Sequence, residues 1–191
     1  ADVTIIATGS YPNNSLFQKA IPHVDKLPGI ELGNIFSAED VMAKKANLGR
    51  KILLLDEGGN WKGCGTAWKL AEDGYDVTLI TPDPLVGKEL QRTAADYPLR
   101  QKLSKLGVSF ILESAITKWE TGRAEIICFL DGQSQTIEAD SLVYATTNIA
   151  KNSLLLDLQD SEIEIISIGD CVSPRSAPFV IYEGHNFGLK I

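Results

Sequence analysis

The sequence predicts an α/β protein built around a parallel sheet. Short, almost continuous apolar runs at 3–7, 51–56 and 141–145 are typical of strands that are buried on both faces. Stretches with helical spacing of apolar residues lie between several of these runs, and glycines mark their ends. With 191 residues, 44% of them hydrophobic, the chain can fill one sizeable core, or one domain and part of another.

The first third of the chain contains one strand and one helix in this prediction. The strand at 3–7 is followed by a connection at 11–34 that is rich in Pro, Gly and Asn and shows little periodicity. Ser37 is expected to cap a helix, because Asp40 follows three residues later and places acidic charge in the first turn. We expect Gly49 to end this helix.

The middle of the chain predicts two β-α-β crossovers. A buried strand at 51–56 precedes a helix at 63–73 and a second strand at 76–81. Leucines at helical spacing predict a further helix at 97–106, and the apolar run at 108–112 predicts a third strand.

The pattern then changes to short strands. Two turn signals separate three strands and predict a β-meander, at 116–119, 124–130 and 136–138. A buried strand is expected at 141–145, another strand at 163–168, and a final helix near 180–191.

The segment from residue 51 to residue 67 has the layout of a Rossmann-type dinucleotide-binding turn, in which a strand enters glycines and then a helix. In the G-x-G-x-x-G frame the three positions are Gly58, Asn60 and Gly63, with Gly59 between the first two. Gly58 and Gly63 suit the tight turn and the close packing of helix on strand. Asn60, in contrast, places a side chain where a pyrophosphate would approach the backbone.

Two further features weaken the dinucleotide signal. Asp56 and Glu57 lie at the strand exit, and a carboxylate ~4 Å from a phosphate costs about 1 kcal/mol in water and about 4 kcal/mol at an effective dielectric of ~20. The acidic residue expected for the ribose is missing, because the second strand ends at Thr81 and Asp83 lies between two prolines. The sequence favours a dinucleotide fold with a degraded nicotinamide site. Weak NAD(P)H binding and an unrelated α/β chain remain open.

Composition excludes several other classes of function. The net charge of −7 disfavours a nucleic-acid partner, and no apolar run reaches the ~20 residues of a membrane span. The three cysteines are far apart, so we expect no zinc or iron–sulfur ligation within the chain and a reducing, cytoplasmic location. The chain opens directly in a strand and lacks an initial Met, which predicts a fragment of a longer protein.

Four pieces of sequence resemble one family in order. They are Ile-Ala-Thr-Gly at 6–9, Glu-Asp-Val-Met at 39–42, the turn at 58–67, and Ile-Gly-Asp-Cys-Val-Ser-Pro-Arg at 168–175 followed by Glu-Gly-His at 183–185. Together they resemble the C-terminal half of old yellow enzyme-like iron–sulfur flavoproteins, a group with dienoyl-CoA reductase, trimethylamine dehydrogenase and histamine dehydrogenase. The resemblance covers nearly the whole chain and looks closest to the trimethylamine dehydrogenase-like branch, whose glycine turn is also degenerate.

This resemblance implies a domain plan of the glutathione-reductase type. Residues 1–11 would end the first half of an FAD/ADP-like domain, 12–148 would form an inserted NAD(P)-binding-like domain, and 149–191 would be part of the return of the first domain. The parent protein would carry FMN on a barrel, a 4Fe–4S cluster, and ADP or FAD in the FAD-like domain. The implied partners are the rest of the parent chain and an electron-transferring flavoprotein.

The damaged turn distinguishes two branches of that group. It suits amine dehydrogenases, which the resemblance implies carry out oxidative N-demethylation and pass electrons to a flavoprotein carrier. It suits dienoyl-CoA reductases badly, because they need NADPH. An active NAD(P)H-binding domain of a 2,4-dienoyl-CoA reductase-like flavin reductase is one alternative. The other is an electron-carrier docking domain with an acidic surface. We assign no catalytic residue to this chain.

The resemblance also places Gly9, Gly169 and Asp170 close to the cofactor of the FAD-like domain. The ordinary alternative is that they form turns, with Asp170 capping a helix or turn. The histidines, His23 and His185, are expected to be solvated or at the edge of a core, because no partnering Ser, Cys or acid can be placed beside them.

The remaining candidates are expected to be structural. Cys64 and Cys128 are predicted to be small buried apolar residues, although a helix N-terminus beside Cys64 would lower its pKa. Trp61 is expected to cover the degraded pyrophosphate site, and stacking on an adenine is the alternative.

Overall fold

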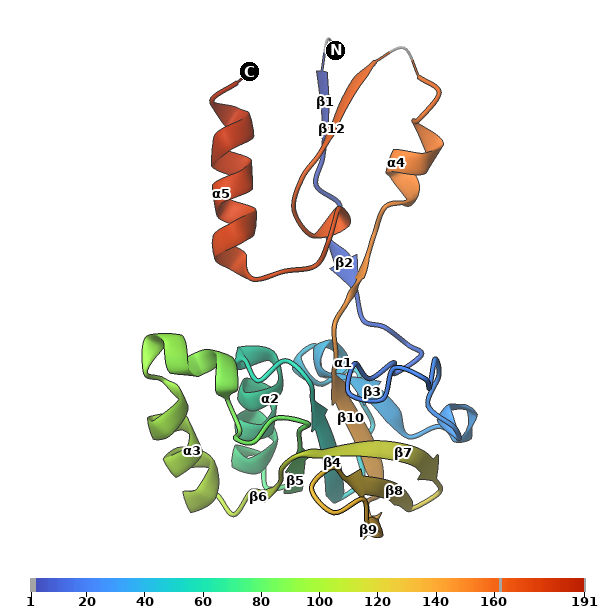
Figure 1. Cartoon of the computed structure of the whole chain (residues 1–191), viewed down its shortest axis with the longest axis vertical. Coiled ribbons are helices and arrows are strands. Elements are labelled where there is room, and N and C mark those ends of the chain that lie inside the picture. Colours follow the sequence, from blue (N-terminus) through green and yellow to red (C-terminus); the bar gives the residue numbers. More distant parts are fainter. Residues whose placement is uncertain (1–2, 162, 191) are drawn as a thin grey trace. The chain divides into compact units, whose positions relative to one another are not determined.

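The computed structural model describes residues 3–161 and 163–190, and the chain divides into two compact units (Figure 1). The insert unit is Asn14–Thr146, and the flanking unit is formed by the described residues on either side of that range. Residues 1–2, 162 and 191, which the predicted domains and the last predicted helix include, lie outside the described residues.

A five-stranded parallel sheet forms the centre of the insert unit, in the order β3-β10-β4-β5-β6. Its strands are β3 (Ile35–Ser37), β4 (Lys51–Asp56), β5 (Asp76–Ile80), β6 (Ser109–Ile111) and β10 (Ser141–Ala145). All five residues of β10 and the last five of β4 are buried, as expected for central strands that are covered on both faces. This confirms the α/β parallel-sheet prediction.

Helices cover one face of this sheet and a meander covers the other. On the first face, Ile52 and Leu54 of β4 pack against α2 (Trp61–Glu72) and α3 (Asp96–Lys105). On the second, Leu53 and Leu55 pack against the meander of β7 (Ser114–Glu120), β8 (Arg123–Cys128) and β9 (Ser134–Glu138). Alternate residues of one strand therefore supply two separate cores.

The helix α1 (Ala38–Met42) has the predicted start but a different end. Ser37 Oγ accepts a hydrogen bond from the Asp40 amide at 3.0 Å, and the Asp40 side chain accepts one from the Ser37 amide at 3.1 Å. This capping box confirms the predicted N-terminus. The predicted end at Gly49 is wrong. The chain leaves the helix at Lys44, whose φ of 58° is left-handed.

Two other helix starts differ from the prediction. The helix α2 begins at Trp61, two residues before the expected start, because Asn60 caps it. The last helix, α5 (Ala177–Gly188), begins at Ala177 instead of residue 180, with a proline in its first turn.

The connection at 11–34, which shows little periodicity, is packed against the meander. Gln18 is 1% exposed and binds both backbone groups of Ile116, accepting from its amide at 3.0 Å and donating to its carbonyl at 2.6 Å. Trp119 Nε1 donates to the Gly33 carbonyl at 3.0 Å. Within residues 11–34, all of which the structure describes, the turn η1 (Ile30–Leu32) is the only helical element. Side-chain hydrogen bonds hold this connection in place.

The flanking unit contains short paired strands and two helices. Strand β1 (Val3–Ile6) pairs in parallel with β12 (Glu164–Ser167), and β2 (Ser10–Tyr11) pairs antiparallel with β11 (Ile149–Ala150). The helices are α4 (Ser153–Asp157) and α5, with a 3-10 turn, η3, at Gly169–Cys171. Ile5 is 44% exposed and Ile181 is 70% exposed. A two-stranded parallel sheet with such exposure is unusual, because parallel sheets are normally covered on both faces.

No helix within residues 3–161 and 163–190 is long and apolar enough to cross a membrane.

Candidate functional site

The glycine turn between β4 and α2 is filled by a side chain of the protein itself. The Asp56 Oδ1 atom accepts hydrogen bonds from the backbone amides of Gly58 at 3.1 Å and Gly59 at 3.0 Å. In a Rossmann site, backbone N–H groups of this turn and of the helix start face the pyrophosphate. Here two of the turn's N–H groups bind an internal carboxylate.

Asp56 is completely buried. Burial raises its pKa to about 6, against the hydrogen bonds from the Cys64 thiol and from the two glycine amides, which lower it. The Cys64 Sγ atom donates to Asp56 Oδ2 at 3.4 Å. Burial and the neighbouring Asp56 carboxylate also raise the pKa of the Cys64 thiol, so the expected lowering by the helix N-terminus is wrong.

Close approach between α2 and the end of β4 requires glycine at position 63. A Cβ atom on Gly63 would lie 2.3 Å from both Cγ and Oδ1 of Asp56. Asp56, the last residue of β4, therefore restricts position 63 in the facing turn of α2 to glycine.

Asn60 satisfies the start of α2. Its Oδ1 atom accepts a hydrogen bond from the Lys62 amide at 2.9 Å, so a further N–H group of the helix N-terminus is bound internally. Trp61 follows as the first helical residue and is 52% exposed. A ligand phosphate would have to replace the Asn60 side chain as well as the Asp56 carboxylate.

The segment after β5 also contacts the glycine turn. The Glu89 amide donates to the Gly59 carbonyl at 2.9 Å, and Lys88 pairs with Asp83 at 2.6 Å. Gly59 has a left-handed φ of 54°, and a Cβ atom there would lie 3.2 Å from the backbone nitrogen of Lys88. Asp83, the residue considered for a ribose contact, is thus engaged by Lys88.

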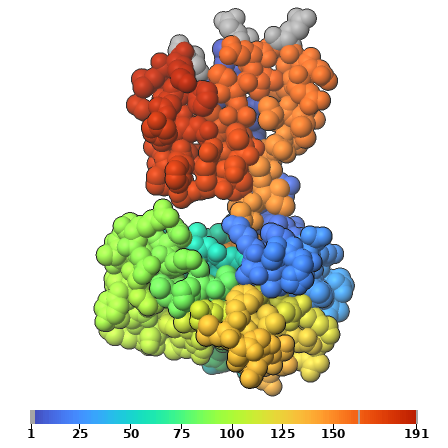
Figure 2. All heavy atoms as spheres, in the orientation of Figure 1, coloured from blue at the N-terminus to red at the C-terminus, as the bar shows by residue number. Residues whose placement is uncertain are grey.

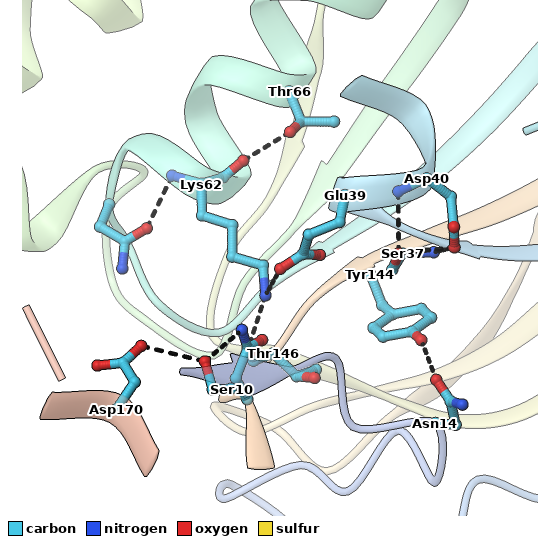
Figure 3. Close-up of polar contacts among 12 residues, drawn as sticks. Ser10, Asn14, Ser37, Glu39, Asp40, Lys62, Thr66, Tyr144, Thr146 and Asp170 are labelled. Carbon is cyan, nitrogen blue, oxygen red and sulfur yellow. Dashed lines mark hydrogen bonds and ion pairs between the residues drawn. The ribbon is translucent and has the colours of Figure 1, made fainter. Parts of the chain in front are cut away.

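A second polar cluster lies at the carboxyl edge of the sheet (Figure 3). Lys62 reaches from the first turn of α2 to Glu39 at 2.9 Å and to the Thr146 carbonyl at 3.2 Å. Glu57 follows β4 at this edge. Burial raises its pKa to about 7, although the nearby backbone amides of Lys19 and Ala20 lower the pKa. Its charge is therefore sensitive to pH near neutrality.

The flanking unit brings three predicted residues to one cavity of about 410 Å³. Gly9, Gly169 and Asp170 all line it, together with Arg175. Asp170 accepts from Ser10 Oγ at 3.0 Å, a bond drawn in Figure 3, and from the Arg175 amide at 3.3 Å. Asp170 therefore both accepts a hydrogen bond from the backbone of the following loop and lines the cavity.

The other singled-out residues do not form a site. His23 and His185 are both exposed and belong to different units. Cys64 is buried as predicted, whereas Cys128 is only half-buried. Within the described part of the chain, no group of three or more His, Cys, Asp or Glu residues is arranged to hold a metal ion.

Comparison with known proteins supplies the family. The family model for pyridine nucleotide-disulphide oxidoreductases matches residues 1–174. The chain belongs to this oxidoreductase family. The match agrees with the Rossmann-like architecture of the insert unit and confirms the predicted FAD/NAD(P)-binding fold class.

Members of the predicted flavoprotein group are among the relatives. Cinnamate reductase of Clostridium sporogenes is 26% identical over 194 residues, which cover 100% of this chain and 27% of the relative. Dimethylamine dehydrogenase of Hyphomicrobium sp. is 21% identical over 195 residues, covering 87% and 26%. The structure of histamine dehydrogenase from Rhizobium sp. 4-9 superposes with a TM-score of 0.88 and 24% identity, covering 100% and 30%. These matches confirm the resemblance to trimethylamine dehydrogenase-like proteins, and the chain spans 26–30% of their lengths.

The sequence did contain one signal for the filled turn. Asp and Asn side chains commonly accept hydrogen bonds from backbone amides two or three residues later. Asp56-Glu-Gly-Gly59 has this pattern. We expected Asp56 only to repel a phosphate, whereas the structure shows it as the acceptor for the turn. The contribution of Lys62 depends on its ion pair with Glu39, which belongs to a distant segment that no local motif indicates.

Proposed function

We propose that this chain is the dinucleotide-fold part of a trimethylamine dehydrogenase-like oxidoreductase, and that its insert unit is a Rossmann scaffold that binds no dinucleotide tightly. The observation that carries the proposal is the pair of hydrogen bonds from the Gly58 and Gly59 amides to Asp56 Oδ1.

The energetic argument compares an internal ligand with an external one. A pyrophosphate in the turn would have to displace the Asp56 carboxylate, and each charge-assisted hydrogen bond lost is worth about 1.5–3 kcal/mol. The displaced carboxylate would remain near the phosphate and repel it. The residues present therefore do not fit a dinucleotide phosphate, and the proposed function includes no hydride transfer at this turn.

Calorimetric titration of the 191-residue chain with NADH and with NADPH tests the proposal. We expect no binding heat from either nucleotide at concentrations up to roughly 100 μM. A dissociation constant in the low micromolar range would contradict it. The same titration at several temperatures guards against a binding enthalpy that happens to be near zero.

The parent protein, in this proposal, is an amine dehydrogenase with FMN, a 4Fe–4S cluster and bound ADP or FAD. The similarity of this chain to dimethylamine dehydrogenase supports this assignment. The parent protein would pass its electrons to a flavoprotein carrier. The filled turn favours this direction of electron flow, because a turn that does not bind NADH cannot receive electrons from it. The reacting groups would lie in the rest of the parent chain, and no residue of this chain is assigned a catalytic role.

The flanking unit would hold part of the ADP or FAD site. Gly9, Gly169 and Asp170 line its cavity of about 410 Å³, and the exposed Ile5 on a two-stranded sheet indicates that further chain covers it. In this proposal residues 1–11 and 149–191 belong to the FAD/ADP-like domain and residues 12–148 to the NAD(P)-binding-like domain. Adenosine diphosphate should therefore bind the full-length protein at micromolar concentration, and removal of Asp170 should weaken that binding.

A functional NAD(P)H-binding domain is the second candidate. Cinnamate reductase aligns over 100% of this chain, which favours a reductase parent. This candidate predicts that NADPH reduces the flavin of the full-length protein, and stopped-flow absorbance at the flavin band measures it. Rapid reduction by NADPH favours the reductase, and reduction only by an amine substrate favours the dehydrogenase.

A docking role for an electron-transferring flavoprotein is the third candidate, and the net charge of −7 favours it. Electrostatic docking predicts association that weakens as ionic strength rises. Surface plasmon resonance with the full-length protein measures this, and association that is insensitive to salt would exclude the acidic surface as the docking determinant.

A further inference from the structure

A second cavity of about 470 Å³ lies in the insert unit, apart from the glycine turn. It is lined by residues of α3, of the end of β6 and of the loop after β5, and none of its lining residues belongs to the range 56–63. Strand β6 is the edge strand of the sheet, and Figure 1 shows α3 at the same edge. The volume of this cavity is within the range of about 300–1,000 Å³ that small-molecule sites occupy.

The cavity has an apolar floor that the core holds in place. Val86 is 1% exposed and belongs to the core under α2 and α3, and Phe110 packs against the same core. Leu85 and Leu112 extend the apolar lining, and Leu112 is 37% exposed. The green atoms in Figure 2 show that α3 and the preceding loop form one continuous surface of the insert unit. An apolar group can therefore be buried here without rearrangement of the core.

The rim of the cavity is cationic. Arg100 and Lys105 both line it, and no acidic residue in the described part of the chain does, although the whole chain carries a net charge of −7. Arg100 is held in place by Asp96, which accepts from its guanidinium at 2.9 Å. Lys105 lies in the last turn of α3, where a positive charge is favoured by the helix dipole.

From this combination we infer that the cavity binds a small organic anion, in which a carboxylate or phosphate is attached to an apolar body. The body would lie on Phe110 and Leu112, and the anionic group would face Lys105 and the outer side of the Arg100 guanidinium. Such a site is independent of the dinucleotide turn, so its ligand would bind whether or not the turn accepts NADH.

Two-dimensional amide NMR of the full 191-residue chain tests the inference with three probes of similar shape. Benzoate and phenyl phosphate carry the anion, and benzyl alcohol is the neutral control. We expect saturable shifts of the Val86, Phe110 and Leu112 amides with either anion, and at least fivefold weaker binding of benzyl alcohol. A stronger response to one anion distinguishes a carboxylate site from a phosphate site. Equal responses to all three probes, or none, would overturn the inference.

A charge-reversal variant separates the site from general anion attraction. Lys105→Glu should weaken binding of the preferred anion roughly tenfold, because it replaces an attractive charge at the rim with a repulsive one. Lys45→Glu makes the same change of charge at an exposed position outside the cavity and should leave binding within twofold. If the two variants weaken binding equally, the attraction is due to net charge and the proposed site is wrong.

Discussion

Gly63 lies directly against the Asp56 carboxylate, so closely that a Cβ atom there would be 2.3 Å from Asp56 Oδ1. The carboxylate is thereby enclosed between the helix turn at Gly63 and the amides of Gly58 and Gly59. The end of β4 and the start of α2 are fitted to an internal anion.

The first prediction concerns this contact. Gly63→Ala should destabilise the insert unit by about 3 kcal/mol, because its methyl group must displace Asp56. Gly65→Ala is the matched control: the same helix has open space there, so it should be neutral or stabilising by up to about 1 kcal/mol. Urea unfolding followed by tryptophan fluorescence measures both, since the three tryptophans lie in the insert unit. Equal effects of the two variants would show that the contact is unimportant.

The second prediction is a titration of the turn by pH. The Gly58 and Gly59 amide resonances should shift together with a midpoint near pH 6, the raised pKa of Asp56. An ordinary aspartate would give a midpoint near pH 4. Amide NMR between pH 3.5 and pH 8 would show the difference, and resonances that do not move in this window would mean that the carboxylate does not bind these amides.

The third prediction follows from Glu57. Its pKa is about 7 in the folded chain, raised from 4.5, so the folded state holds more protons than the unfolded state between these values. The stabilising contribution is complete below pH 4.5 and is lost as pH rises through 7. Glu57→Gln should therefore reduce the fall in stability across this window by at most roughly 3 kcal/mol.

Urea unfolding at pH 5 and at pH 8 compares Glu57→Gln with the wild type. Glu31→Gln, at an exposed position, is the control and should leave the pH dependence unchanged. A pH dependence in Glu57→Gln equal to that of the wild type would mean that burial does not perturb this carboxyl group.

The fourth prediction concerns the packed connection. Gln18→Leu should cost about 2–4 kcal/mol, because it leaves the buried amide and carbonyl of Ile116 without their side-chain partner. Gln18→Glu should retain acceptance from the amide but lose donation to the carbonyl. Urea unfolding should therefore rank wild type above both variants, and a neutral effect of Gln18→Leu would show that water replaces these bonds.

The sequence predicted the elements that depend on local patterns. The runs at 51–56 and 141–145 were recognisable because both faces of β4 and β10 are buried, and the capping box at Ser37 was recognisable because its two partners are three residues apart. The end of α1 was not, because a left-handed Lys44 has no strong signature, whereas glycine is the usual residue at such a position.

The candidate site was predicted less completely, because its chemistry depends on burial. The weak glycine pattern indicated a degraded turn, but Asp56 could be recognised as an internal ligand only once its hydrogen bonds and complete burial were known. Gln18 and Ile116 lie almost a hundred residues apart in the sequence, so the contact between them leaves no periodic signal.

The central claim, that Asp56 fills the dinucleotide turn, is tested most directly at the two amides that it binds. NADH titrated into the 191-residue chain at pH 7.5 should leave the Gly58 and Gly59 amide resonances unshifted up to about 1 mM. Saturable shifts of both amides at micromolar NADH would contradict the account, because they would show that the phosphate displaces the carboxylate.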